Sequence, residues 1–270
     1  MAANKYVCKV CGYVHEGKEA PAVCPLCKAG AKEFEAVNAK AGKKGLDTNS
    51  DIYAILYSAV VVIIVAFLLA GVSSILKPKQ DANIELDKKK QILASLNIKE
   101  QADAAATYAS VIKADPIVNI NGEVVAENGG FAVANEDIVD ANLPIYIAEV
   151  DGAKKYIIPM IGNGLWGGIW GYLALNEDCN SIYGVYFSHA SETPGLGAEI
   201  ASEKFQSRFV GREVYIGDSV ALSVVKKVEN ETVQVNAVSG ATITCNGVSD
   251  MLSRELKPYK AYLDNVKPVK

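Results

Sequence analysis

Four cysteines near the N-terminus have the spacing of a metal site. Cys8 and Cys11 form one C-x2-C pair, Cys24 and Cys27 form a second, and twelve residues separate the pairs. Two such pairs can place four thiolates around one tetrahedral ion, and a segment this short needs such a link because its apolar core is small. The spacing predicts a structural zinc ribbon or an electron-passing iron site, since four thiolates suit either metal. Disulfides are a third reading, disfavoured in a reducing compartment.

A second group of residues has the composition of an anion site. Ser239, Gly240, Ala241 and Thr242 precede apolar residues at helical spacing, namely Val248, Met251, Leu252 and Leu256. This periodicity predicts a helix over about 243–263. Thr242 then lies in or beside the first turn, where unpaired backbone N–H groups favour a phosphate. The alternative is an ordinary N-cap, in which a Ser or Thr hydroxyl satisfies those N–H groups and nothing binds.

The longest uncharged segment predicts a helix that crosses a lipid bilayer. Residues 52–76 are twenty-five consecutive uncharged residues. As a helix they would be about 37 Å long, against a hydrocarbon core of about 30 Å. A core helix of this length would have a polar face, and a signal peptide would not follow fifty residues that contain four ordered cysteines. Tyr53 and Tyr57 near one end and Lys77 and Lys79 beyond the other resemble membrane-surface anchors.

Charge is unevenly distributed along the 270 residues. The first fifty carry eight lysines and five acidic residues, whereas the remainder carries nineteen basic and twenty-six acidic residues, for a net charge of −4. Neither part has the concentrated basic charge of a nucleic-acid-binding surface, so nucleic acid is set aside as a partner. Residues 38–51 are small, polar and glycine-containing, which predicts a flexible linker between a metal domain at 1–37 and the membrane helix.

Residues 77–270 predict an α+β domain with a mostly antiparallel sheet. An amphipathic helix is expected over 80–98, and another helix over about 197–209. Short apolar runs separated by turn residues predict strands at 146–150, 155–161, 168–175, 181–187 and 219–228.

Three glycines in this domain match a dinucleotide-binding pattern. Gly162, Gly164 and Gly167 have G-x-G-x-x-G spacing. That site needs a helix opening at the glycines and an acidic residue about twenty positions further on. A strand-like segment follows instead, and Phe187 occupies the acidic position. We therefore expect the glycines to form a bend between strands or to let a flat group approach the backbone.

The sequence around the four cysteines resembles the rubredoxin-like domain found at the end of rubrerythrins. The resemblance rests on the two C-x2-C pairs, Gly12-Tyr13, Pro25 and Phe34, and it covers about residues 5–37. It implies an Fe(Cys)4 site on Cys8, Cys11, Cys24 and Cys27, with zinc as the alternative. It also implies a small aromatic core of Tyr6, Tyr13 and Phe34.

Four further segments resemble the C subunit (NqrC) of sodium-translocating NADH:quinone oxidoreductases (Nqr). They are QDANIELDKKKQILASLNI (80–98), GNGLWGGIWGYLAL (162–175), HASETPGLGAEI (189–200) and SGATITCNGV (239–248), and the resemblance covers about residues 48–260. It implies FMN attached by a phosphoester to Thr242, installed by a separate flavin transferase that uses FAD, in a flavin core at about 145–260. The preceding metal domain departs from the family pattern.

The same resemblance implies further cofactor-binding residues. The ETPGLG segment lies beside the flavin in such proteins, which here points to Glu192, Thr193, Gly195, Leu196 and Gly197. Thr193 and the backbone of 195–197 are expected to hydrogen-bond the flavin edges, and Leu196 to pack on the ring, whereas Glu192 can also be a capping or salt-bridging residue. Trp166 and Trp170 are candidates to flank the ring, although aromatic residues at strand ends more often belong to the core. Ser239, Gly240 and Ala241 complete the attachment motif.

These expectations describe an electron-carrying subunit of a membrane oxidoreductase that translocates sodium, in which the flavin supplies the redox chemistry and no side chain is catalytic. The resemblance implies other subunits of the complex as partners. It places the chain in the cytoplasmic membrane, with 1–37 cytoplasmic and 77–270 on the opposite side. The flanking lysines, three before the span and five after it, favour the reverse orientation. The alternatives are the G subunit of an Rnf-type ferredoxin:NAD complex and a membrane-anchored zinc-ribbon binding protein without a redox role.

Overall fold

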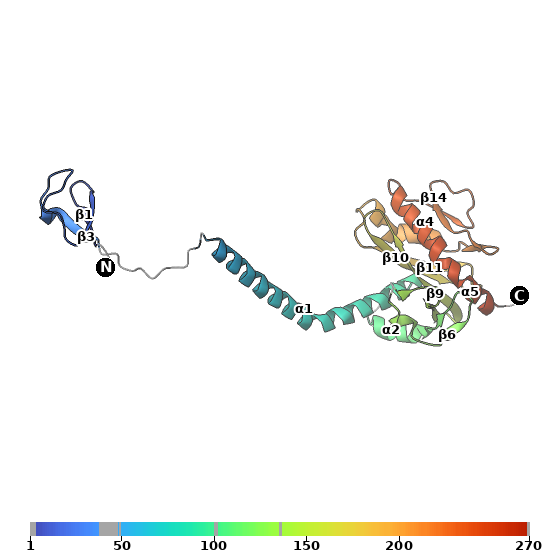
Figure 1. Ribbon diagram of the computed structural model, residues 1–270. Helices are drawn as coiled ribbons and strands as arrows, with labels where there is room; N and C mark the ends of the chain where they lie inside the picture. The colour runs from blue at the N-terminus through green and yellow to red at the C-terminus, as the bar shows by residue number, and fades with distance from the viewer. Residues whose placement is uncertain (1–3, 38–47, 49, 100–101, 135–136, 269–270) are drawn as a thin grey trace. The chain divides into compact units, whose positions relative to one another are not determined.

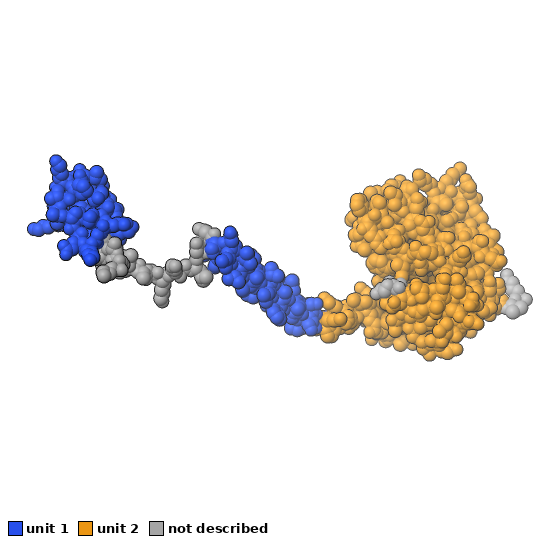
Figure 2. All heavy atoms as spheres, viewed as in Figure 1, with its two compact units in different colours: residues 1–76 blue, residues 77–270 orange. Residues whose placement is uncertain are grey.

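The computed structural model describes residues 4–37, 48, 50–99, 102–134 and 137–268, with the order of elements shown in Figure 1. Contacts within the chain divide it into two units, residues 1–76 and 77–270 (Figure 2). The predicted linker at 38–51 lies largely outside the described residues.

The N-terminal unit begins with a small antiparallel sheet in the order β2-β1-β3. Its strands are β1 (Asn4–Cys8), β2 (Val14–Gly17) and β3 (Phe34–Val37), and the 3-10 helix η1 (Ala31–Glu33) precedes β3. The expected aromatic core is only half-buried at Tyr6, Tyr13 and Phe34. Among the described residues of this sheet and its loops, only Cys8 and Cys24 are buried. The metal-binding cysteines therefore form the centre of this fold, as expected for a segment with little apolar area to bury.

A single 45-residue helix, α1 (Asp51–Ser95), contains both of the helices expected at 52–76 and 80–98. Pro78 lies inside α1, where its missing N–H removes one backbone hydrogen bond. The first part of α1 is long and apolar enough to cross a membrane, and its apolar window is exposed throughout. The last turns are different, because Ile92, Leu93 and Ser95 are buried within the second unit.

The second unit is built on a five-stranded sheet in the order β11-β10-β9-β8-β4, in which every neighbouring pair is antiparallel. Its strands are β4 (Ile112–Ala114), β8 (Tyr146–Val150), β9 (Ala153–Asn163), β10 (Gly168–Leu175) and β11 (Ile182–His189). Four of the predicted strands correspond to β8 to β11, with ends that differ by at most two residues. The predicted α+β fold with a mostly antiparallel sheet is confirmed.

The two faces of this sheet carry different helices, because successive side chains of a strand point to opposite faces. On one face Ile92 of α1 and Leu96, just after that helix, pack with Tyr172 and Ala174 of β10. On the other face α4 (Thr242–Leu256) packs against β9, and Met251 joins the larger core cluster with Leu173. The attachment motif at 239–242 therefore lies at the start of a helix held on the face opposite α1.

Three predicted elements are interrupted. The helix expected at 197–209 is split into η4 (Gly197–Ala201), α3 (Glu203–Gln206) and η5 (Ser207–Phe209), because Ser202 is extended and caps α3 through the N–H of Phe205. The strand expected at 219–228 is split into β13 (Ser219–Val220) and β14 (Ser223–Val225), because the N–H groups of residues 221 and 222 both bond to the carbonyl of Val214. The last predicted helix becomes α4, η6 (Lys257–Tyr259) and α5 (Lys260–Val266).

The remaining elements complete the second unit. They are α2 (Ala104–Val111), η2 (Gly130–Ala132), the sheet of β6 (Val124–Ala126), β5 (Ile117–Val118) and β7 (Leu143–Pro144), β12 (Tyr215–Ile216) paired with β13, and β15 (Gln234–Asn236) parallel to β14.

Candidate functional site

The SGAT motif leads into α4, and Thr242 is the first residue of that helix. Ala241 occupies the N-cap position and makes no side-chain hydrogen bond. In the part of the chain that the structure describes, neither Ser239 nor Thr242 donates or accepts through its hydroxyl, so the ordinary N-cap is not observed. Thr242 is exposed. The first turn of α4 thus keeps its N–H groups and positive dipole end available for an anion beside a free hydroxyl.

The loop before Thr242 is held by contacts with two other segments. The Arg208 guanidinium donates hydrogen bonds to the carbonyls of Asn236 at 2.6 Å and Ala237 at 3.3 Å. Gly240 has φ +80°, which favours glycine, and a Cβ there would lie 2.9 Å from Cδ2 of Leu196. The sequence-predicted residues Gly240 and Leu196 are therefore neighbours.

Glu192 joins three segments at the base of this site. Its carboxylate is only 4% exposed. Oε1 accepts a hydrogen bond from the backbone N–H of Trp166 at 2.7 Å, and Oε2 accepts one from the hydroxyl of Thr244 at 2.7 Å. Glu192 thus connects the β9–β10 turn, its own loop and the first turn of α4, and it forms no ion pair with any described residue.

The environment of Glu192 favours its charged form. Burial alone would raise the pKa of this carboxyl, but the hydrogen bonds from Thr244 and from the backbone of Trp166 and Leu165 outweigh burial and lower the pKa below its usual value. The backbone N–H of Glu192 also donates to Nδ1 of His189 at 3.3 Å, which gives that histidine a structural contact.

The glycines that resemble a dinucleotide fingerprint serve close packing instead. Gly164 and Gly167 lie in the turn between β9 and β10, where the N–H of Gly164 bonds to the carbonyl of Gly167 at 2.8 Å. A Cβ at Gly164 would lie 2.4 Å from Oε1 of Glu192, and one at Gly197 would lie 2.2 Å from Oε2. A Cβ at Gly162 would meet Met251 of α4 at 2.7 Å. The expected bend between strands is present, and two of these glycines with Gly197 make room for Glu192 and α4.

Exposed apolar side chains lie on the segments that are connected to the first turn of α4. Trp166 is 65% exposed and belongs to the turn bonded to Glu192, while Leu165, Leu196 and Ile243 are also well exposed. These side chains offer a flat aromatic group an apolar surface that water otherwise covers. Thr193 and Gly195 are exposed in the same loop, whereas Gly197 is buried.

Trp170 does not share this surface. Its indole N–H donates to Oε1 of Gln91 on α1 at 3.1 Å, on the opposite face of the sheet. The expectation that Trp166 and Trp170 flank one flat cofactor is therefore wrong for Trp170. Side chains of β10 alternate between the two faces of the sheet, and Trp170 points to the α1 face, as Tyr172 does.

The four N-terminal cysteines form a second candidate site. Their Sγ atoms all lie within 4.8 Å of one another. The closest approaches are 3.6 Å between Cys8 and Cys27 and 3.5 Å between Cys11 and Cys24. These separations are too long for disulfides, and all four are free thiols. The arrangement fits one tetrahedral ion with four sulfur ligands.

The two cysteine loops have matching backbone geometry. The N–H of Gly12 bonds to the carbonyl of Cys8, and the N–H of Lys28 bonds to the carbonyl of Cys24, each at 2.9 Å. Both residues have a positive φ, +75° and +59° respectively. Burial alone would raise the pKa of Cys24, but the backbone N–H groups of Cys27 and Leu26 and the side chains of Cys11 and Cys27 lower it to about 7. The backbone groups of Tyr13 and Ala29 act to lower the pKa values of Cys11 and Cys27, yet burial and the neighbouring thiols raise both.

The other two cysteines are free, buried thiols outside the cysteine cluster, and Cys245 lies in the first turn of α4. Cys179 donates to the carbonyl of Glu177, and Cys245 accepts from the backbone N–H of Val238. Burial raises the pKa of both thiols. They do not form a disulfide.

Sequence reasoning missed Thr244, Arg208 and the packing roles of Gly164 and Gly197. Thr244 is buried two residues after the exposed Thr242, which a helix periodicity could have indicated. Arg208 gave no signal, since its partners are backbone carbonyls.

Comparison with known families finds a match over each of the two regions that contain these sites. The family described as FMN-binding domain matches residues 164–257, and the family described as Rubrerythrin, rubredoxin-like domain matches residues 6–35. The C subunit of the Na(+)-translocating NADH-quinone reductase of Haemophilus ducreyi is 30% identical over 212 residues, which cover 70% of this chain and 82% of that protein. The corresponding protein of Pasteurella multocida is 32% identical over 213 residues, covering 68% and 82%.

A solved structure is similar over the same proportion of the chain. The crystal structure of the C subunit of this reductase from Parabacteroides distasonis has a TM-score of 0.66 and 39% identity, and the match covers 70% of this chain and 96% of that one. Identity, coverage and fold lead to one assignment: the chain belongs to the family of C subunits (NqrC) of the Na(+)-translocating NADH-quinone reductases.

Proposed function

We propose that this chain is an electron-carrying subunit of a Na(+)-translocating NADH-quinone reductase and that it holds FMN covalently through Thr242. The observation that carries the proposal is the exposed Thr242 hydroxyl at an N-terminus of α4 that has no side-chain cap. The match of residues 164–257 to an FMN-binding domain supports the choice of FMN.

The residues around Thr242 fit this cofactor. The first N–H groups of α4 would stabilise the phosphate, and Trp166, Leu196 and Ile243 would cover the ring system. The loop of Ser239, Gly240 and Ala241 leads into the helix without a side-chain cap that would compete with the phosphate. Beside Leu196, the hydroxyl of Thr193 and the backbone of Gly195 offer polar groups to the cofactor. When bound, FMN would supply one- and two-electron redox chemistry. Covalent attachment would keep the flavin in place through repeated turnover.

Attachment requires a separate flavin transferase with FAD as donor. In this step Oγ of Thr242 forms a bond to the phosphorus of the FMN portion, and the phosphoanhydride bond of FAD breaks. AMP leaves, and the hydroxyl proton is released. Glu192 and Thr244 would act as positioning residues, because they fix the turn that carries Thr242.

We further propose that Cys8, Cys11, Cys24 and Cys27 hold one iron ion, with zinc as the alternative. The rubredoxin-like match and the four clustered Sγ atoms support a metal, and an iron site would exchange electrons with a donor or a partner subunit.

For the arrangement in the cell, we propose a metal domain at 1–37, a linker at 38–51, one bilayer crossing at 52–76 and an FMN domain at 77–270. The metal domain would be cytoplasmic and the FMN domain extracytoplasmic. The partners would be the other subunits of the complex, and the apolar first part of α1 supports the crossing.

In-gel flavin fluorescence tests the attachment. The full chain, coexpressed with the transferase, is denatured and separated, so that only covalent flavin remains in the band. We expect fluorescence from the wild type and from Ser239→Ala and none from Thr242→Ala. Because attachment needs only a hydroxyl, Thr242→Ser should retain part of the signal. A wild-type band without fluorescence, or a fluorescent Thr242→Ala band, would refute the assignment of Thr242.

A further inference from the structure

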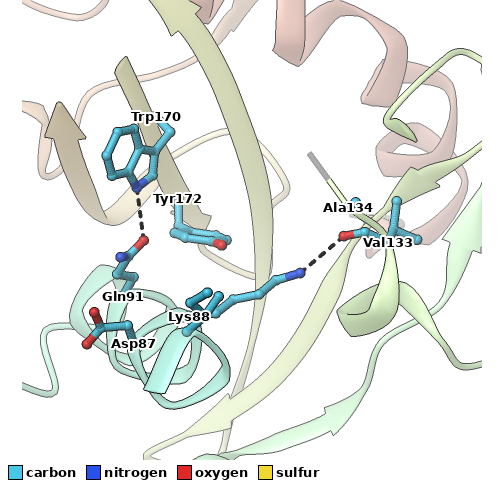
Figure 3. A pocket seen from close by; sticks show the side chains of 8 residues that line it. Asp87, Lys88, Gln91, Val133, Ala134, Trp170 and Tyr172 are labelled. Atoms are coloured by element: carbon cyan, nitrogen blue, oxygen red, sulfur yellow. Dashed lines mark hydrogen bonds between the residues drawn. The ribbon is translucent and has the colours of Figure 1, made fainter. Parts of the chain in front are cut away.

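A groove runs along one flank of α1 where this helix lies on β10 and β11. Two cavities of about 410 Å³ and 290 Å³ both have Asp87 and Gln91 in their lining, so they adjoin along the helix. Figure 3 shows the larger cavity, with the side chain of Tyr172 between Trp170 and Lys88. We call this feature, lined by Ile84, Asp87, Lys88, Gln91, Trp170 and Tyr172, the α1 groove.

Hydrogen-bond donors in the α1 groove are left unused. Tyr172 is only 4% exposed, yet its hydroxyl has no hydrogen-bond partner among the described residues. The Lys88 ammonium has three protons and uses two, bonding to the carbonyls of Phe131 at 2.6 Å and Val133 at 3.2 Å. Gln91 accepts from Trp170 through its oxygen, which leaves its NH2 group free. Of these three side chains Tyr172 is buried, where a donor is normally satisfied, and Lys88 and Gln91 are half-buried. The groove therefore suits a ligand that brings acceptors.

Charge in the α1 groove also favours an acidic occupant. Lys89 is paired with Glu85 and Lys99 with Glu203, each at 2.6 Å. Lys88 and Lys90, which line the two cavities, have no ion-pair partner in the part of the chain the structure describes. Asp87 is the acidic residue among the lining side chains, and the charge of Asp115 also acts on Lys88. Two lysines without an ion pair thus remain available to a carboxylate.

An apolar contact lies beside these groups. Ile84 is 66% exposed, one turn before Lys88 and two before Gln91 on the same stripe of the helix. Trp170 adds an apolar ring to the same lining, beside Gln91. An occupant would need a carboxylate and, next to it, an apolar side chain.

The distance of the α1 groove from the membrane-spanning part of the helix favours a protein over a lipid as its occupant. Ile84 lies eight residues beyond Leu76 and Gln91 lies fifteen beyond it, or about 12 Å and about 22 Å of helix. The headgroup layer is only about 5–8 Å deep on each side of a bilayer. The α1 groove would therefore begin beyond the headgroups.

We infer that the α1 groove docks an acidic extramembrane segment of another subunit of the reductase. A carboxylate of that segment accepts hydrogen bonds from Lys88, Gln91 and Tyr172, and a neighbouring apolar side chain packs on Ile84 and Trp170. This inference rests on the proposed function, because it requires that the chain assemble with other subunits.

Site-specific photocrosslinking tests the occupant. Benzoylphenylalanine replaces Ile84 in the full chain, which is coexpressed with the other subunits and irradiated, and adducts are identified by mass spectrometry. We expect an adduct with an Asp- or Glu-containing peptide of another subunit. The same probe at Val125, which is 59% exposed in β6, should not give that adduct. An adduct with phospholipid only, an adduct with a second copy of this chain, or no adduct would overturn the inference.

Copurification separates the inference from the proposed function. Ile84→Glu should reduce the yield of other subunits recovered with the tagged full chain several-fold, whereas Val125→Glu should not. Tyr172→Phe should also reduce that yield, yet leave the thermal stability of the isolated chain unchanged or higher, because its hydroxyl has no partner there. If the wild-type chain recovers no other subunits, the proposed function fails. If it recovers them and both groove variants do so equally well, only the inference fails.

Discussion

The hydroxyl of Thr244 donates a hydrogen bond of 2.7 Å to the carboxylate of Glu192, although the two residues lie 52 positions apart in sequence. This bond fixes the first turn of α4 to the loop of 192–197. Because Thr242 is two residues before Thr244, the same contact determines where the proposed attachment hydroxyl lies. Because both side chains are buried, water cannot take the place of either hydrogen-bond partner unless the surrounding residues rearrange.

Glu192→Gln should destabilise the second unit. An amide would turn an NH2 donor toward either the Trp166 N–H or the Thr244 hydroxyl, both of which donate to Glu192 in the wild type. We expect the free energy of unfolding to fall by about 1–3 kcal/mol, the cost of leaving a buried donor unpaired. Urea unfolding of the detergent-solubilised full chain, followed by tryptophan fluorescence, measures this loss. Thr244→Val should lose a similar amount and Thr244→Ser much less. Equal stability of Glu192→Gln and wild type would show that the carboxylate has no such role.

The low pKa of Glu192 should make stability depend on acidic pH. The carboxyl has a lower pKa in the folded state than in the unfolded state, where it is about 4.3. Its ionised form therefore stabilises the fold above that unfolded value, and the contribution is lost as the pH falls through the folded value. Between about pH 7 and about pH 3, the urea midpoint of wild type should fall further than that of Glu192→Gln, which does not titrate. Parallel pH profiles would argue against this linkage.

Gly240→Ala should affect both stability and flavin attachment. A Cβ at Gly240 would lie 2.9 Å from Leu196, and the residue has a positive φ. Gly217 also has a positive φ but has no atom within 4 Å of such a Cβ, so it is a matched control. We expect each variant to lose about 1–2 kcal/mol from the backbone alone. Only Gly240→Ala should reduce in-gel flavin fluorescence, since only it displaces the loop at Leu196. An equal reduction in Gly217→Ala would indicate that general destabilisation is responsible.

Cys24→Ser should release the metal from the N-terminal unit. Cys24 is one of two buried residues among those described in this sheet and its loops, so the fold there would depend on a bound ion. Elemental analysis of the purified full chain should show about one iron or zinc per wild-type chain, as a single four-sulfur site requires, and a large loss in the variant. Cys245→Ala serves as the control, because Cys245 is a buried thiol outside the cysteine cluster. Full metal content in Cys24→Ser would contradict the four-cysteine site.

Local sequence patterns predicted the parts of the fold whose periodicity is regular. The strands β8 and β10 have the bounds expected from their apolar runs, and Thr242 begins a helix as its motif indicated. The prediction of one continuous helix at 197–209 was wrong, because Ser202 adopts an extended conformation and caps a new helix. That choice depends on packing against β11, which no local pattern records.

The sequence motifs of the candidate site could be predicted, whereas the contacts between its side chains could not. The spacing of the four cysteines is sufficient to indicate a cluster, since both loops close locally. The bond between Glu192 and Thr244 could not be derived, because it joins segments that only the folded sheet brings together. The sequence left two positions open for Trp170, because which face of β10 meets α1 is set by the folded sheet and not by the strand itself.

The alternation of β10 gives the second unit two independent surfaces. Trp166, Leu196 and Ile243 lie on segments connected to the start of α4, while the α1 groove opens on the other face of the sheet, and layers packed on a sheet lie about 10 Å from it. A protein bound in the proposed groove would thus leave the proposed cofactor side uncovered for a second partner. Because one sheet would separate assembly from electron transfer, mutations would weaken either one without altering the other.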